Sequence, residues 1–147
     1  MSAASRRSST PSLDPKVLAA REPSPRMFDR PQPTGLEAIF RPRSVAVVGA
    51  SRRPGSIGAA IFKNLLAHGF EGPVYPVNPA ASVVQSVLAW PTLSSIPSEV
   101  DLAIIAVPAK QVLAAVEECG HKGVKGVVII TAGFKETGPE GAAHEIL

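Results

Sequence analysis

The stretch SVAVVGASRRPGSIG, residues 44–58, decides the fold of this chain. A run of small apolar residues breaks into glycines and then continues as an amphipathic segment, which predicts a strand, a glycine-rich turn and a helix. A turn of this kind directs backbone N–H groups toward one point, and that arrangement favours an anion, usually a phosphate. The sequence therefore predicts a ligand that carries phosphate.

Length and composition limit the class of protein. The chain has 147 residues, of which 45% are hydrophobic and 18% charged, as is ordinary for one globular domain. No apolar run approaches the roughly twenty residues of a membrane-spanning helix, so we expect no membrane partner. The single cysteine, Cys119, excludes an internal disulfide and a CxxC zinc site, and it is compatible with a reducing compartment. We therefore expect a cytoplasmic location.

The formal net charge of +3 is unevenly distributed along the chain. Residues 1–43 contain eight Arg and Lys against four Asp and Glu, whereas residues 44–147 contain seven against eight. The later part is not basic, and it lacks the clustered Lys and Arg with interleaved aromatic residues that nucleic-acid binding requires. We expect no nucleic-acid partner.

The sequence divides into two regions that differ in composition and in apolar patterning. Residues 1–34 are rich in Ser, Arg and Pro without a periodic apolar pattern, which predicts a disordered tail. An organelle transit peptide is the alternative, although three acidic residues in this region disfavour it. Residues 35–147 form the predicted domain. Its last residues indicate a helix that begins at Pro139 and stops within its pattern, so we expect a fragment of a longer protein.

Strands and helices alternate through the predicted domain. Continuous Val, Ile, Leu and Ala runs indicate strands buried on both faces, as in a parallel sheet covered by helices. Right-handed crossovers then predict an α/β fold, a Rossmann-like doubly wound parallel sheet with strand order about 3-2-1-4-5. Its ligand crevice should lie at the carboxyl ends of the strands. The predicted elements are a short helix at 36–40, strands at 45–48, 74–77, 87–89, 102–107 and 126–131, and helices at 56–68 and 110–119.

Each long predicted helix carries one apolar stripe, and each stripe should cover one face of the sheet. The first stripe comprises Ile57, Ile61, Phe62, Leu65 and Leu66, and the second comprises Val112, Leu113, Ala115, Val116 and Cys119.

The glycine turn does not match the common nucleotide fingerprints. Its glycines stand at Gly49, Gly55 and Gly58, which is not the G-x-G-x-x-G spacing of dinucleotide sites, and no Gly-Lys-Ser/Thr of a P-loop is present. The second strand ends in Asn78, where NAD binding would favour an acid. The alternative that these glycines only allow close packing of strand and helix stays open. Arg52 is a candidate phosphate partner, although a solvated loop charge is the simpler interpretation.

Four linked motifs carry a family resemblance. They are RPRSVAVVGASRRPGSIG, GPVYPVNP, VDLAIIAVPA and GVVIITAGFKETGPEG, in this order. Together they resemble the N-terminal CoA-binding domain of ADP-forming acyl-CoA (acetyl-CoA) synthetases, which is related to the succinyl-CoA synthetase alpha subunit and also occurs fused to GNAT protein acetyltransferases. The resemblance covers residues 36–147 and implies a Rossmann-like fold with CoA or acyl-CoA as the ligand.

The resemblance also implies a site. The glycine turn would contact the phosphates, the turn after the second strand would border the adenine and ribose, and the ends of the fourth and fifth strands would line the pantetheine path. Many family members carry Lys or Arg after the Asn-Pro pair, where this chain has Ala80 and Ala81, so that cationic contact is lost or supplied by Arg52. The candidate cofactor-binding residues are Gly49, Ala50, Ser51, Arg52, Gly55, Ser56, Ile57, Gly58, Val77, Asn78, Pro79, Val107, Pro108, Ile130, Thr131, Ala132 and Gly133.

No catalytic or metal-ligating residue is predicted. The phosphohistidine that the family implies lies in a later domain, and His68, His121 and His144 match no such motif, which favours surface positions at helix ends. Cys119 and Trp90 are expected to be packing residues. The expected partners are CoA and a synthetase, ATP-grasp or acetyltransferase domain absent from this chain. The alternatives are an NAD(P)-binding oxidoreductase domain and a non-catalytic regulatory nucleotide-sensing module.

Overall fold

The computed structural model describes residues 31–131, which belong to a compact unit that begins at Pro31. Within it Pro33 is buried, and Gln32 Nε2 donates to Glu99 Oε2 at 2.9 Å. These residues therefore contribute to the folded unit. The remainder of the predicted N-terminal tail and the predicted helix from Pro139 lie outside the described residues.

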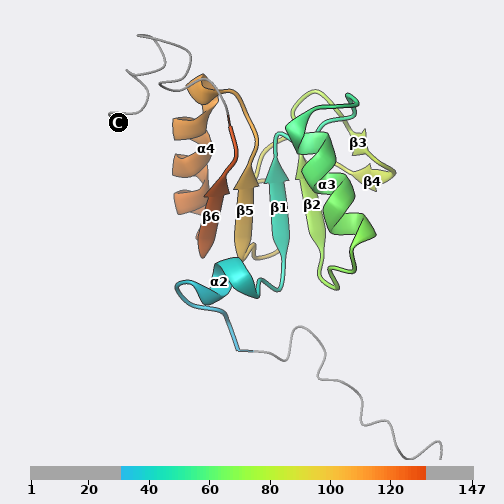
Figure 1. The fold of residues 1–147 in the computed structure, drawn as a ribbon. Helices are drawn as coiled ribbons and strands as arrows, with labels where there is room; N and C mark the ends of the chain where they lie inside the picture. Colours follow the sequence, from blue (N-terminus) through green and yellow to red (C-terminus); the bar gives the residue numbers. More distant parts are fainter. Residues whose placement is uncertain (1–30, 132–147) are drawn as a thin grey trace, which may run out of the picture. The chain divides into compact units, whose positions relative to one another are not determined.

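A four-stranded parallel sheet forms the centre of the unit (Figure 1). Its order is β2-β1-β5-β6, so β1 lies inside the sheet, with β2 on one side of it and β5 and β6 on the other. All four residues of β1 are buried, as its unbroken apolar sequence predicts. The doubly wound parallel fold expected from the sequence is thus confirmed. The strands are β1 (Val45–Val48), β2 (Val74–Val77), β5 (Leu102–Ile105) and β6 (Gly126–Ile129).

Helices cover opposite faces of this sheet. Phe62 of α3 packs in one core cluster with Val47, while Cys119 of α4 packs in another with Val48. Because neighbouring residues of a strand point to opposite faces, the two helices lie on the two sides of the sheet. Among the predicted stripe residues Ile57, Leu66, Leu113 and Val116 are exposed, so each stripe is buried only in part. The helices are α2 (Glu37–Phe40), α3 (Ile57–Ala67) and α4 (Ala109–Lys122).

Helix α4 is longer than the sequence pattern predicts. It continues past Cys119 to Lys122 and ends because Gly123 adopts a left-handed conformation with φ of 73°. The Gly123 N–H then caps the carbonyls of Cys119 and Gly120. His121, expected just beyond the helix, therefore lies in its last turn. No helix among residues 31–131 is long and apolar enough to span a membrane.

The short strand predicted at 87–89 is present as β4 (Val87–Leu88), but it pairs antiparallel with β3 (Val83–Val84) in a separate hairpin that was not predicted, instead of joining the main sheet. Trp90, two residues after β4, makes a single parallel bridge with Val77 of β2. Its N–H donates to the Pro76 carbonyl and its carbonyl accepts from the Asn78 N–H, both at 2.9 Å. The position beside β2 in the predicted order is thus occupied by one bridge rather than a full strand.

An ion pair ties the strands together at the amino end of the sheet. Asp101, with 1% of its side chain exposed, accepts from Arg43 Nε at 2.8 Å and from the Arg43 backbone N–H at 3.0 Å. The Asp101 carbonyl accepts from the N–H groups of Lys125 and Gly126, and its own N–H donates to Ser44 Oγ at 3.0 Å. One residue therefore joins the starts of β1, β5 and β6.

Candidate functional site

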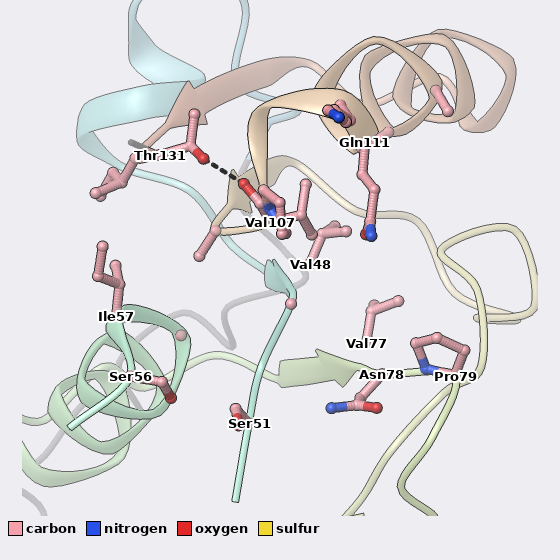
Figure 2. A pocket seen from close by; sticks show the side chains of 18 of the residues that line it. Val48, Ser51, Ser56, Ile57, Val77, Asn78, Pro79, Val107, Gln111 and Thr131 are labelled. Atoms are coloured by element: carbon pink, nitrogen blue, oxygen red, sulfur yellow. Dashed lines mark hydrogen bonds between the residues drawn. The ribbon is translucent and has the colours of Figure 1, made fainter. Parts of the chain in front are cut away.

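A pocket of about 880 Å³ lies at the carboxyl ends of the strands, where Figure 2 shows side chains from several elements converging. In doubly wound sheets this edge is the usual ligand crevice. It is bounded by the turn after β1, the first turn of α3, the end of β2 and the start of α4. The predicted residues that line it are Gly49, Ser51, Gly55, Ser56, Ile57, Gly58, Val77, Asn78, Pro79, Val107, Pro108, Ile130 and Thr131.

The other predicted site residues are placed differently. Ala50 is fully buried in the core beneath α3 and does not line the pocket. In the glycine turn Arg53, not Arg52, is the arginine that lines the pocket. Ala132 and Gly133 lie outside the described residues.

Two glycines allow the turn after β1 to pass close to its neighbours. Gly49 has φ of +92°, and a Cβ there would lie 2.5 Å from the Ala106 carbonyl oxygen. A Cβ on Gly58 would lie 2.0 Å from the Gly49 carbonyl oxygen, closer than any real contact. Close packing of strand and helix is therefore a role of Gly58, and it brings the first turn of α3 against the pocket.

Two serine hydroxyls form hydrogen bonds within the turn after β1 and at the start of α3. Ser56 is the N-cap of α3: its Oγ accepts from the Ala59 N–H at 3.3 Å and donates to the Arg53 carbonyl at 2.9 Å. Ser51 Oγ accepts from the Arg53 N–H at 3.0 Å and keeps its own proton to donate. The geometry of a helix start leaves the Ile57 and Gly58 amides without an intrahelical acceptor. Those two amides and the helix dipole suit an anion.

The Asn78 side chain, at the end of β2, is engaged at both ends of its amide. Its Nδ2 donates to the Ala50 carbonyl at 2.6 Å, and its Oδ1 accepts from the Ala80 N–H at 2.8 Å. The first contact ties the end of β2 to the turn after β1, and the second closes an Asx turn. The Asn-Pro pair is therefore a turn, and in Figure 2 it also forms one side of the pocket.

Helix α4 supplies lining residues that the sequence analysis missed. Gln111 and Glu118 are two turns apart and share one face of the helix with Ala114 and Ala115. In Figure 2 the Gln111 side chain reaches from α4 toward Val77 and the end of β2. The spacing was readable in the sequence, but which face of α4 meets the crevice depends on how the helix packs. Pro91, Thr92 and Lys110 also line the pocket.

The end of β6 is held to the end of β5. The Thr131 hydroxyl donates to the Val107 carbonyl, as Figure 2 shows, and the Ile130 N–H donates to the Ile105 carbonyl at 2.8 Å. Val107 and Ile130 thus present apolar side chains at the same edge of the pocket.

The pocket has a mixed charge. Arg53 and Lys110 are the cations that line it in the described part of the chain, and Glu118 is the acid. The Glu118 carboxylate accepts from the Ser94 N–H at 2.9 Å, so it also holds the loop that carries Thr92. Residues 31–131 contain no group of three or more His, Cys, Asp or Glu that could hold a metal ion.

Neither Cys119 nor His68 lines the pocket. Burial raises the pKa of the Cys119 thiol to about 11, with a further contribution from Glu118, so the thiol stays protonated at neutral pH. Cys119 fills the core under α4, as expected. His68 is the C-cap residue of α3, with its Nδ1 3.0 Å from the Asn64 carbonyl. His144 lies outside the described residues.

Comparison with known proteins identifies the family. A profile of the CoA binding domain matches residues 43–144. The chain is 52% identical over 114 residues to the alpha subunit of acetate–CoA ligase (ADP-forming) I from Pyrococcus furiosus, a match that covers 75% of this chain and 25% of that protein. It is 46% identical over 107 residues to 4-hydroxybutyrate–CoA ligase (ADP-forming) from Nitrosopumilus maritimus, covering 73% and 15%.

A solved structure gives the same result. The dinucleotide forming acetyl-coenzyme A synthetase 1 of Ca. Korarchaeum cryptofilum, in complex with phosphate and ADP, superimposes with a TM-score of 0.69 at 46% identity, covering 76% of this chain and 24% of that one. The chain thus spans about a quarter or less of the length of these relatives. The resemblance carried by its four motifs is confirmed, and the chain belongs to the CoA-binding domain family, in the form found in ADP-forming acyl-CoA synthetases.

Proposed function

We propose that this chain binds CoA or acyl-CoA in the pocket at the carboxyl end of its sheet and presents the thiol or thioester end to another domain. The observation that carries the proposal is the junction of β1 with α3, where two free helix amides and the Ser51 hydroxyl face a crevice lined by Arg53. This arrangement suits the pyrophosphate of CoA.

The remainder of the pocket supports an extended nucleotide ligand. Its volume of about 880 Å³ is near the upper end of ordinary small-molecule sites, as a ligand of CoA size requires. The end of β2, with Val77 and Pro79, offers apolar surface for adenine. The ends of β5 and β6, with Val107 and Ile130, offer an apolar path for pantetheine. The ligand would cross the strands from β2 to β6.

A nicotinamide dinucleotide suits the pocket less well. The acid that would hold its ribose hydroxyls at the end of β2 is replaced by Asn78. The glycine spacing also departs from the dinucleotide fingerprint. Both differences favour CoA.

The relatives favour a synthetase as the whole protein. Proteins whose names describe ADP-forming acetate–CoA and 4-hydroxybutyrate–CoA ligases match this region with a quarter or less of their length. We infer that the chain supplies the CoA-binding part of such a ligase in the cytoplasm, and that acyl activation belongs to other domains. In that reaction the CoA thiol would lose its proton and attack the carbonyl carbon of an acyl phosphate, so that the C–S bond forms as the C–O bond to phosphate breaks and inorganic phosphate leaves. The role of this chain is to hold and orient the sulfur.

Calorimetric titration of CoA into the 147-residue chain tests the proposal, with NAD⁺ as the control ligand. We expect saturable binding of CoA in the micromolar range and at least tenfold weaker binding of NAD⁺. Circular dichroism of the same sample establishes that the chain is folded. A folded chain that ignores CoA up to millimolar concentration would contradict the proposal and favour a regulatory module, while preferred binding of NAD⁺ would favour the oxidoreductase alternative.

Adjacent arginines in the glycine turn provide a matched pair for the phosphate contact. Arg53→Gln should weaken CoA binding about fivefold, or by about 1 kcal/mol, because Arg53 lines the pocket and a charged donor is lost. Arg52→Gln, which removes the same charge one residue away, should change the dissociation constant by less than twofold. Titrations at low and high salt check this, since the Arg53 effect should shrink as salt screens the pair. Equal effects of the two substitutions would contradict a specific contact.

A further inference from the structure

The environment of Asn78 fixes what kind of residue can stand at the end of β2. The Ala50 carbonyl, 2.6 Å away, can only accept a hydrogen bond, and the Ala80 N–H, 2.8 Å away, can only donate one. Exchange of the nitrogen and oxygen of the Asn78 amide would place two acceptors together and two donors together. The orientation of the amide is therefore determined by its neighbours.

Aspartate cannot replace this arrangement. An ionised carboxylate accepts hydrogen bonds at both oxygens and donates none, so one of its oxygens would face the Ala50 carbonyl oxygen at the present 2.6 Å separation. The tie between the end of β2 and the turn after β1 would be replaced by repulsion. The fold thus requires a neutral donor where dinucleotide-binding enzymes of the same architecture place an acid.

The position matters because doubly wound folds bring the ribose of an adenine nucleotide to the end of β2. An acid there holds a ribose with both hydroxyls free, but it would repel a ribose that carries a phosphate. The ribose of CoA is phosphorylated on its 3′ oxygen. The described turn after β2, including the exposed Ala80, adds no negative charge near that point.

We infer that Asn78 is a positioning residue that sets the ligand class of the pocket: it fixes the turn after β1 and keeps the ribose end uncharged, so that a 3′-phosphorylated adenine nucleotide is accepted. The inference deepens the proposed function and rests on it. It assigns selectivity to an internal hydrogen bond rather than to a direct contact with the nucleotide.

Comparison of CoA with dephospho-CoA, which differs only in the 3′-phosphate, tests the inference on the 147-residue chain. We expect the unaltered chain to bind CoA at least as tightly as dephospho-CoA. Asn78→Asp should weaken both ligands because the tie is lost. It should also raise the ratio of the CoA to the dephospho-CoA dissociation constant about tenfold, because only CoA carries the 3′-phosphate that the new charge repels. Asn78→Ala removes the tie without adding charge, so it should weaken both ligands and leave the ratio within twofold of its starting value.

A second pair of variants avoids the internal hydrogen bond. Ala80 is exposed, so Ala80→Glu and the similarly shaped Ala80→Gln should both fold, as thermal melting will check. Ala80→Glu should raise the ratio of the two dissociation constants severalfold, and Ala80→Gln should not. An unchanged ratio in both acidic variants would overturn the inference while leaving the proposed function intact. Failure of the unaltered chain to bind either ligand would overturn the proposed function and the inference with it.

Discussion

Replacement of Gly58 by alanine is expected to lower the free energy of unfolding by about 3 kcal/mol and to abolish measurable CoA binding. The added Cβ would lie 2.0 Å from the Gly49 carbonyl oxygen and 3.3 Å from the Ala50 Cα, and both are backbone atoms that cannot rotate away. Helix α3 would have to move off the end of β1. That movement would also displace the Ile57 and Gly58 amides from the crevice, so stability and binding should fall together.

Gly120 provides the matched control for this substitution. It also lies in a helix, α4, but a Cβ there would meet no atom within 4 Å. Gly120→Ala should therefore stabilise the chain by about 0.5–1 kcal/mol, because alanine loses less backbone entropy than glycine on helix formation. Urea unfolding measures both variants, and titration with CoA measures their binding. A Gly58→Ala variant as stable as the unaltered chain would show that α3 does not pack as closely as described.

The main sheet was predictable because its strands are short, continuous apolar runs and because amphipathic helices follow β1 and β5. The hairpin was not, because each of its strands has two residues and its turn places Gln85 and Ser86 at φ of 48° and 67°. Such turns normally contain Asn or Gly, so the local sequence carried no recognisable signal. The end of α4 was predicted too early, at Cys119, because a glycine commonly ends a helix and Gly120 comes next. Gly120 lies inside the helix, and the glycine that caps it is Gly123.

The location of the site was predictable because the carboxyl ends of parallel strands meet at one edge of the sheet. Which residues after β1, β2, β5 and β6 line it was implied by the family resemblance. The choice between Arg52 and Arg53 depends on the path of a bent turn, and the contribution of Gln111 and Glu118 depends on the rotation of α4 about its axis. Both are set by tertiary packing, which residue spacing does not contain.

The chemistry of Asn78 shows a further limit of sequence reasoning. From the sequence, the absence of an acid at that position argued only against a nicotinamide dinucleotide as the ligand. The structure adds a cause within the protein, because the amide holds the turn after β1 in place. A residue can thus influence ligand choice through the shape and charge that it imposes on the backbone around it.

The opposite end of the sheet carries no lining residue of the pocket, and there Asp101→Asn is expected to destabilise the chain by about 3 kcal/mol at pH 7 without changing the CoA dissociation constant. Asp101 is 1% exposed and its partner Arg43 is 14% exposed, so loss of the carboxylate removes a buried counter-charge that lies 2.8 Å from a largely buried guanidinium. Burial alone would raise the pKa of Asp101, but the hydrogen bonds and charge of Arg43 outweigh it and hold that pKa below its usual value.

The sign of the pH dependence follows from that lowered pKa. The contribution of Asp101 is fully present above the pKa of the unfolded chain, near 4, and is lost as pH falls through the lower pKa of the folded chain. Urea unfolding at pH 7 and at successive steps below pH 4 should therefore show a smaller acid-induced loss of stability in Asp101→Asn than in the unaltered chain. Glu99→Gln makes the same chemical change at a residue that is 66% exposed and 3.7 Å from Arg43, so it should shift stability by less than about 0.5 kcal/mol. Equal effects of the two substitutions would contradict the prediction that burial of the Arg43–Asp101 pair determines its contribution to stability.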